Sequence, residues 1–392
     1  MSSFHIHCWL YYYFIIRLTY SESLSVLPSY DHTPRRTNHF PGLFIFGYGN
    51  VGSAICRNIL FPTTDLSAPS TSYPAFTHIY ASARSINNIP LESPTGITFV
   101  SITDTAQLES CLSTSSHILI TIPPMMNENI PLNTNLTHNS YKDAILDSDI
   151  SNMIPSSSWI GFLSTTGVYG NHDNEWVDES NTTIQGGVGG GTVTKAHAFL
   201  DVEQRWKKKA MSIHATLRIF RCAGIYGNHA SALHTILKTG FHEDPKSQVL
   251  TSRIHIQDVA RAILTSMNQY NRDTHRDIDM LSSQLGSEEN YDIYNLSDDE
   301  PASRYDVFTY ASTLLLSQGW VLPTRNATTI TVTTNTTLVK TSERQKRRLQ
   351  ESKRVMNKKM KDQLLGNQGL TYKTYREGLL SILQYIRHQS IS

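Results

Sequence analysis

The sequence predicts an α/β protein built on a parallel β-sheet with helices on both faces. Between residues 43 and 227, short apolar runs alternate with helix-like segments, which is typical of βα units. Several runs are nearly continuous in apolar or β-branched residues, as in strands covered on both faces. A glycine-rich turn follows the first run, at residues 47–52. Together these observations indicate a Rossmann-type doubly wound parallel sheet, followed by a smaller C-terminal lobe.

The first half of the chain supplies most of the expected sheet. The expected strands are residues 43–47, 77–83, 96–102, 117–122, 158–164 and 215–221. The expected helices between them cover residues 50–60, 105–112 and 194–211. We therefore assign residues 41–226 to a dinucleotide-binding core.

Beyond residue 227 the pattern changes to helices joined by short strands. Expected helices lie in "ASALHTILKTG" (230–240, ending at a glycine) and "TYKTYREGLLSILQYI" (371–386). A strand followed by a helix is expected in both 254–267 and 291–316. We assign residues 227–392 to a C-terminal substrate lobe that completes the same fold. Insertions are expected at 61–76, at 186–191 and, rich in Thr and Asn, at about 324–341.

The first forty residues form a tail outside this fold. The apolar run 8–16 is too short to span a bilayer, and no basic segment precedes it. Residues 17–40 are rich in Ser, Thr and Arg, as organelle transit peptides are. A plastid or mitochondrial targeting segment, a disordered extension and a mispredicted start codon remain alternatives, so the expected location is cytoplasmic or organellar. No stable membrane span is expected.

Charge and cysteine content exclude several classes of function. The formal net charge is +1, which argues against a general attraction to nucleic acid or acidic lipid. The four cysteines are scattered without metal-ligand spacing, so neither a disulfide scaffold nor a zinc site is expected. The basic residues between 344 and 361 have no interleaved aromatics, and we interpret them as a solvated helix face. Arg253, His255 and Asp258 are expected to tie the C-terminal lobe to the sheet by ion pairs and hydrogen bonds.

The glycine turn predicts a site for a dinucleotide. Gly47, Gly49 and Gly52 form G-x-G-x-x-G between an apolar strand and a helix. The first permits the tight turn, the second lets the backbone approach a pyrophosphate, and the third lets the helix pack closely. The pyrophosphate would lie at the helix N-terminus, beside Asn50 and Val51. Ile122 and Pro123, at the end of the fourth strand, are further candidate contacts.

Arg84 favours NADP over NAD as the dinucleotide. It follows the expected second strand, where NAD sites usually carry an acidic residue, and a guanidinium there suits a 2′-phosphate. Asp65 has nearly the spacing of that acidic residue but lies in an expected loop. Asp104, after the third strand, could accept a hydrogen bond from the adenine amino group. NAD remains possible.

Several ordered motifs resemble the extended short-chain dehydrogenase/reductases, the NAD-dependent epimerase/dehydratase group. The resemblance covers roughly residues 41–386 and is clearest in "GFLSTTGVYG" (161–170). The later motifs resemble an atypical, sugar-nucleotide-epimerase-like branch. They are "RCAGIYG" (221–227), "RIHIQDVARAI" (253–263), "YNLSDDEPAS" (294–303), "KRVMNKKMKDQL" (353–364) and "TYREGLLSIL" (374–383).

The resemblance implies catalytic positions and also exposes a gap among them. The family uses a Ser/Thr, a Tyr acid/base and a Lys four residues after the Tyr. Thr165 and Lys195 match the first and last, but Gly191 stands in the Tyr position. Tyr169, His172 or Asp173 could serve instead, or an insertion could shift the register, and Tyr169 is also interpretable as a packing residue. The resemblance thus implies an NADP-dependent oxidoreductase or epimerase acting on a nucleotide sugar or related small molecule, or else a non-catalytic NADP(H)-binding or sensing protein.

Overall fold

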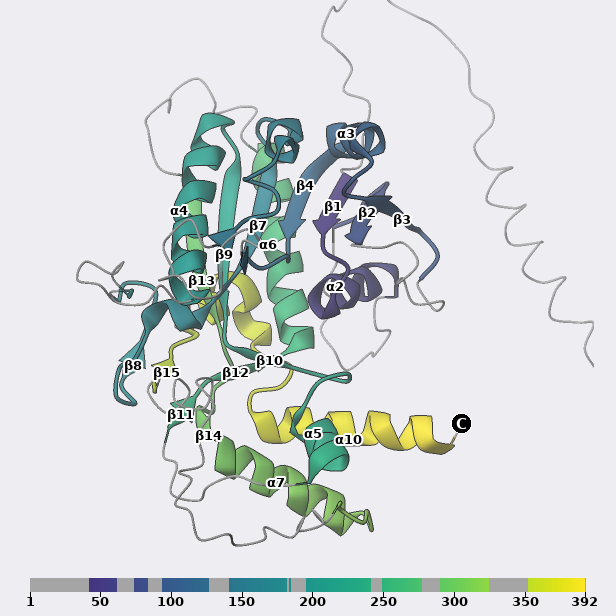
Figure 1. The fold of residues 1–392 in the computed structure, drawn as a ribbon, viewed down its shortest axis with the longest axis vertical. Coiled ribbons are helices and arrows are strands. Elements are labelled where there is room, and N and C mark those ends of the chain that lie inside the picture. Colours follow the sequence, from purple (N-terminus) through teal and green to yellow (C-terminus); the bar gives the residue numbers. More distant parts are fainter. Residues whose placement is uncertain are drawn as a thin grey trace, which may run out of the picture. The chain divides into compact units, whose positions relative to one another are not determined.

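The computed structural model describes residues 42–61, 74–83, 94–126, 141–181, 183–184, 195–240, 249–276, 290–323 and 352–391. All of them belong to one compact unit, Phe40–Ser392 (Figure 1). No helix in this described part of the chain is long and apolar enough to cross a membrane.

A seven-stranded parallel sheet forms the centre of the unit. Its strands are β1 (Gly42–Phe46), β2 (Ile79–Ala83), β3 (Ile97–Ser101), β4 (Ser115–Ile120), β7 (Trp159–Thr165), β9 (Thr216–Cys222) and β13 (Tyr291–Leu296). They lie in the order β3-β2-β1-β4-β7-β9-β13, and every pairing is parallel. The order reverses between β1 and β4, which is where doubly wound sheets bind their ligands. The predicted fold class and the six predicted strands are confirmed.

Helices cover both faces of the sheet, so the central strands are buried on both sides. Leu43 and Ile45 of β1 pack in one apolar core with α2 (Asn50–Leu60) and α6 (Ile256–Arg276). Phe44 and Phe46 point to the other face, which α3 (Thr105–Ser113), α4 (Lys195–Ser212) and the 3₁₀ turn η3 (Asp149–Met153) cover. Because side chains alternate along a strand, a strand that serves two apolar cores must be apolar throughout, as GLFIF is.

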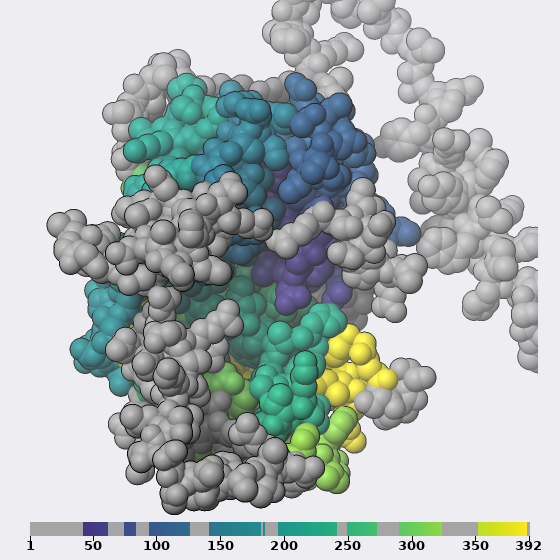
Figure 2. Space-filling view, viewed as in Figure 1, coloured from purple at the N-terminus to yellow at the C-terminus, as the bar shows by residue number. Residues whose placement is uncertain are grey.

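A third apolar core lies in the C-terminal lobe. It is built by α5 (Ala232–Thr239), α7 (Arg304–Ser317) and α10 (Tyr375–Ile391), which gather at one end of the sheet layers (Figure 2). Gly240, with φ +75°, ends α5 as predicted. The lobe is interleaved with the core in sequence, since α6 and β13 follow residue 227 yet belong to the helix layer and the sheet.

Short elements join these layers. The two-stranded pairs are β10 (Gly224–Tyr226) with β12 (Arg253–His255), β11 (Leu250–Thr251) with β14 (Ala302–Ser303), β8 (Trp176–Val177) with β15 (Arg354–Val355), and β5 (Met125–Met126) with β6 (Tyr141–Lys142). The remaining helical segments are η4 (Thr166–Tyr169), α9 (Lys358–Met360), the π-helical η5 (Lys361–Leu365) and η6 (Gly366–Gln368).

Residues 352–357, which we call the strap, cross beneath the loop that follows η4. Lys353 is buried, and its Nζ donates to the carbonyl oxygen of Gly170 at 2.7 Å. Arg354 donates from Nε to the carbonyl of Asn174 at 2.6 Å. The predicted solvated helix face is therefore wrong for this segment: it begins as a buried extended strand whose cations bond to backbone carbonyls. Residues 344–348 lie outside the described residues.

Asp258 and Arg253 bond to other parts of the C-terminal half of the chain, so the predicted tie to the sheet itself stays a prediction. Asp258 accepts hydrogen bonds from the backbone N–H of Thr371 at 2.7 Å and of Tyr372 at 3.0 Å. Arg253 donates to the carbonyl of Ala302 at 2.9 Å. His255 differs, because its Nε2 is buried without a partner among the described residues.

Candidate functional site

The glycine turn follows β1 at the point where the strand order reverses. Gly47 has φ +101°, a conformation that L side chains rarely adopt, and its N–H donates to Ser82 Oγ at 3.1 Å. A Cβ built on Gly47 would lie 2.6 Å from Thr121 Oγ1. Glycine is therefore required here by both backbone conformation and space.

Gly52 allows α2 to begin against the turn. A Cβ at this position would lie 2.4 Å from the carbonyl oxygen of Gly47, which is closer than real Cβ contacts come. The helix can approach the turn only because this side chain is missing. Gly47 and Gly52 thus have a structural explanation within the protein itself.

Gly49 has no such explanation. A Cβ built there meets no atom of the described residues within 4 Å, and its φ of −90° suits any residue. Gly49 is also the N-cap of α2, where no side chain caps the helix. The first N–H groups of a helix need partners from outside it, and they favour an anion. The open space at Gly49 and the uncapped start of α2 fit a pyrophosphate.

Two hydroxyl side chains hold the turn in place. Thr121, directly after β4, donates from Oγ1 to the carbonyl oxygens of Phe46 at 3.0 Å and Gly47 at 2.8 Å. Ser82 of β2 accepts from Gly47 on the other side. Neither residue was predicted from the sequence, although a small hydroxyl residue at the end of each strand that flanks β1 could have indicated them. Ile122 lies 3.0 Å from the Cβ position of Gly47, and Pro123 beside it is exposed.

The two residues predicted to meet the adenosine of a dinucleotide, Asp104 and Arg84, follow β3 and β2. Asp104 is the N-cap of α3, and its Oδ1 accepts from the backbone N–H of Gln107 at 3.1 Å. This cap explains the residue locally without any ligand. Arg84 lies outside the described residues, directly after Ala83 at the end of β2.

Thr165 and Lys195 come from elements that meet. Thr165 ends β7 and caps η4, accepting from the N–H of Gly167 at 3.1 Å. Lys195 begins α4 and is exposed, and the next residue, Ala196, has its Cβ 3.9 Å from the Cβ position of Gly167. The start of α4 thus lies against η4. Gly191 lies outside the described residues, so the register of the missing Tyr stays a prediction.

The Tyr169 hydroxyl has polar partners on both sides. It donates to Asn295 Oδ1 at 2.8 Å and accepts from Arg221 Nη1 at 3.1 Å, and the residue is 2% exposed. Burial raises the pKa of this hydroxyl, against the opposing effect of Arg221. A general acid/base needs a pKa moved toward the working pH. The geometry therefore favours the interpretation of Tyr169 as a packing residue.

A buried ion pair fixes this tyrosine. Glu203 of α4 is fully buried and accepts from Arg221 Nη2 at 2.8 Å and Nε at 3.1 Å. Ser164 donates to the same carboxylate at 2.5 Å. Burial opposes the charge of Arg221, but Glu203 outweighs this effect and raises the pKa of the guanidinium. The bonds join α4, β7 and β9 beneath Thr165 and were not anticipated from the sequence.

The other two acid/base candidates lie in the turn after η4, and one of them, His172, bonds to the strap. The backbone N–H of His172 donates to Ser352 O at 2.9 Å, and its Nε2 lies 3.0 Å from the carbonyl of Tyr169. Asp173 has φ +47° and accepts from Asn171 Nδ2 at 2.6 Å. Both residues thus build the turn that the strap closes. Within the described residues, no group of three or more His, Cys, Asp or Glu could hold a metal ion.

Solved structures with the same arrangement of elements include several nucleotide-sugar enzymes. A UDP-glucose 4-epimerase from Thermotoga maritima, solved with UDP-glucose, matches with a TM-score of 0.55 at 12% identity, over 89% of this chain and 99% of that one. A UDP-glucuronic acid 4-epimerase from Bacillus cereus in complex with NAD matches with a TM-score of 0.54 at 14% identity, over 88% and 97%. The chain has the fold of these epimerases.

A structure of unknown function is also similar. A conserved protein from Silicibacter pomeroyi, described as functionally unknown, matches with a TM-score of 0.59 at 24% identity, over 88% of this chain and 99% of that one. No family model and no curated protein matches the sequence. The similarity to these solved structures confirms the predicted Rossmann-type fold.

Proposed function

We propose that the protein binds a nicotinamide dinucleotide in the crevice at the ends of β1 and β4. The observation that carries this proposal is Gly49, whose missing side chain leaves open space beside the uncapped N-terminus of α2. Gly47 and Gly52 shape the turn, while Asn50 and Val51 present backbone N–H groups to the phosphates. The similar structure solved with NAD supports this ligand class.

We propose NADP rather than NAD as the preferred cofactor, on the strength of Arg84. Only NADP carries a 2′-phosphate for the guanidinium to bind. Arg84→Ala should weaken NADP binding roughly tenfold or more and leave NAD binding nearly unchanged, given about 1.5–3 kcal/mol for a hydrogen bond to a charged group. Calorimetric titration of both dinucleotides into both proteins measures this, and equal losses for the two cofactors would show that Arg84 is structural.

The substrate class proposed is a nucleotide sugar or a related polyol. Support comes from the similar epimerase solved with UDP-glucose. In this proposal the Thr165 hydroxyl orients a substrate hydroxyl, and Lys195 holds the ribose of the cofactor. The dinucleotide, when bound, supplies or accepts the hydride, and Asp104 meets the adenine.

Gly191 at the expected Tyr position and the buried Tyr169 hydroxyl favour the second function, NADP(H) binding without turnover. Gly191 has no proton to exchange, and the Tyr169 hydroxyl is buried with its pKa raised. Losing general acid–base catalysis typically costs about 10²–10⁴-fold in rate. Thr165 and Lys195 should then affect binding more than rate.

A screen for hydride transfer decides between the two functions. The cofactor-loaded protein is mixed with UDP-sugars at several pH values, and both dinucleotide absorbance and the sugar products are followed, because an epimerase returns the hydride and leaves no net change in absorbance. We expect little or no turnover, and a Tyr169→Phe variant should behave as the parent does. Robust turnover with one ionisation near neutral pH, lost in Tyr169→Phe, would show instead that Tyr169 is the acid.

A further inference from the structure

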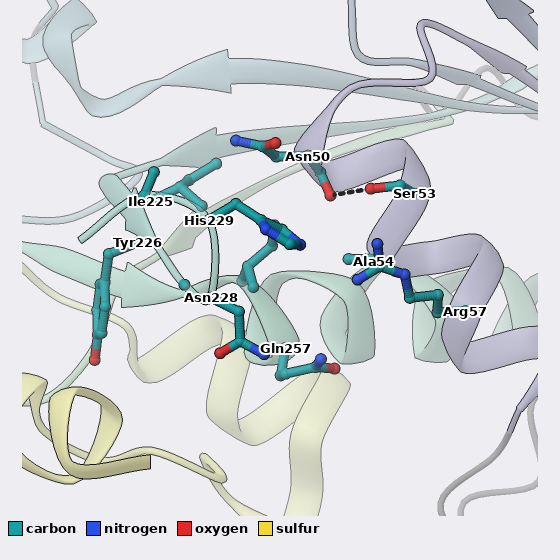
Figure 3. Close-up of a pocket in the computed structure, with 12 residues that line it drawn as sticks. Asn50, Ser53, Ala54, Arg57, Ile225, Tyr226, Asn228, His229 and Gln257 are labelled. Carbon is teal, nitrogen blue, oxygen red and sulfur yellow. Dashed lines mark hydrogen bonds between the residues drawn. The ribbon is translucent and has the colours of Figure 1, made fainter. Parts of the chain in front are cut away.

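A hollow beside the glycine turn is lined by polar side chains from three segments (Figure 3). It is open to solvent and has a cavity volume of about 40 Å³. Its polar side chains are Asn50, Ser53 and Arg57 from α2, Asn228 and His229 from the loop after β10, and Gln257 from the start of α6. None of the residues that line it is acidic.

Two basic side chains face each other in this hollow. Arg57 comes from the second half of α2 and His229 from the loop, and Figure 3 shows them pointing toward one another. Among the described residues, the Arg57 guanidinium has no carboxylate within ion-pair distance and no side-chain hydrogen bond. Elsewhere in the described chain, Arg205, Arg221 and Arg261 all pair with a carboxylate. Arg57 thus differs from these arginines in facing a hollow instead of an acid.

The side chains that line the hollow favour a ligand with an oxyanion, such as a phosphate, because they are donors without a negative charge. A guanidinium presents a planar fork of N–H donors that matches phosphate oxygens. Asn228 and Gln257 add neutral amide donors below it (Figure 3). Because none of the lining residues is acidic, the lining itself would attract an anion.

We propose that this hollow binds a phosphoryl group of a second ligand, distinct from the dinucleotide. The proposal rests on the proposed function, because it takes the dinucleotide pyrophosphate to lie at Gly49. Arg57 is eight residues along α2 from Gly49, or about 12 Å along the helix axis. A phosphoryl group held by Arg57 and His229 therefore lies alongside the helix, although the hollow itself extends to Asn50 at the helix N-terminus. A phosphorylated substrate held there would enter next to the cofactor crevice.

Calorimetry with inorganic pyrophosphate tests the site directly. The full chain is titrated with pyrophosphate, alone and with saturating NADP, and separately with NADP. We expect pyrophosphate to bind in both cases, and Arg57→Ala or His229→Ala to weaken it roughly tenfold or more. Arg57→Lys should restore only part of the affinity, because it keeps the charge and loses the fork. NADP affinity should stay within twofold of the parent, and Arg272→Ala, an exposed arginine farther along α6, is the matched control.

Each alternative result has a separate meaning. Absent pyrophosphate binding, or binding that Arg57→Ala and His229→Ala leave unchanged, would overturn the site. Competition by NADP, with equal loss of NADP affinity in Arg57→Ala, would show that the hollow belongs to the cofactor site and would overturn the second ligand. Arg57-dependent pyrophosphate binding by a chain that fails to bind NADP would leave this site standing and reject the proposed cofactor function alone.

Discussion

At the scale of single residues, one buried carboxyl in the described chain has an oxygen without a hydrogen-bond partner and a raised pKa. Asp298, just after β13, is 1% exposed, and its Oδ2 has no partner among the described residues. Its Oδ1 accepts from the backbone N–H of Glu300 at 3.3 Å. Burial raises the pKa of this carboxyl from 3.8 to about 8. The folded chain therefore holds a proton at neutral pH that the unfolded chain has already released.

This proton makes stability depend on pH. Between the unfolded pKa and about 8 the folded state binds more protons, so the free energy of unfolding falls as pH rises through this window. Asp298→Asn keeps the Oδ1 acceptor and removes the charge. We expect it to raise the free energy of unfolding at pH 8 by roughly 1–3 kcal/mol and to flatten its decline between pH 5 and 8. Urea unfolding at several pH values measures both effects, with exposed Asp149→Asn as the control, and parallel curves for Asp298→Asn and the parent would contradict this account.

At the scale of elements, the strap shows what the sequence could and could not predict. The central strands were predictable because burial on both faces makes them continuously apolar. The β8–β15 pairing was not, because it joins two-residue strands almost 180 positions apart and carries no periodic pattern. Lys353 looked solvated because charged residues usually are, yet it is buried and bonded to Gly170.

The strap should therefore be sensitive to the loss of one ammonium group. Lys353→Met keeps most of the length of the side chain but removes the ammonium group that donates to the Gly170 carbonyl. We expect a loss of roughly 2 kcal/mol in the free energy of unfolding, as for a buried hydrogen bond to a charged group. The matched control is Lys358→Met, whose exposed pairing with Asp362 should contribute little. Equal midpoints of urea unfolding for the two variants would show that the Lys353 bond contributes nothing.

At the scale of the whole molecule, the parallel strands bring the candidate site residues to the same end of the sheet. The glycine turn, Thr121 and Thr165 all lie at the carboxyl ends of parallel strands, so the motif could be located before the structure was known. The supporting residues could not be: Ser82, Thr121 and the Glu203–Arg221 pair act through neighbours distant in sequence. The lobe boundary was also beyond the sequence pattern, since nothing in residues 291–296 shows that β13 joins the far edge of the sheet.

The central claim is that Gly49 is a glycine for the sake of a ligand, and Gly49→Val tests it most directly. Within the part of the chain that the structure describes, the built Cβ meets no atom within 4 Å, and φ −90° and ψ −163° suit a β-branched residue. The variant should therefore fold, losing only about 1 kcal/mol because Val is a poorer N-cap than Gly. Calorimetric titration with NADP should show binding to the parent chain and a loss of about a hundredfold or more in the folded variant, because the side chain fills the space of the pyrophosphate. Undiminished NADP binding by folded Gly49→Val would contradict the account.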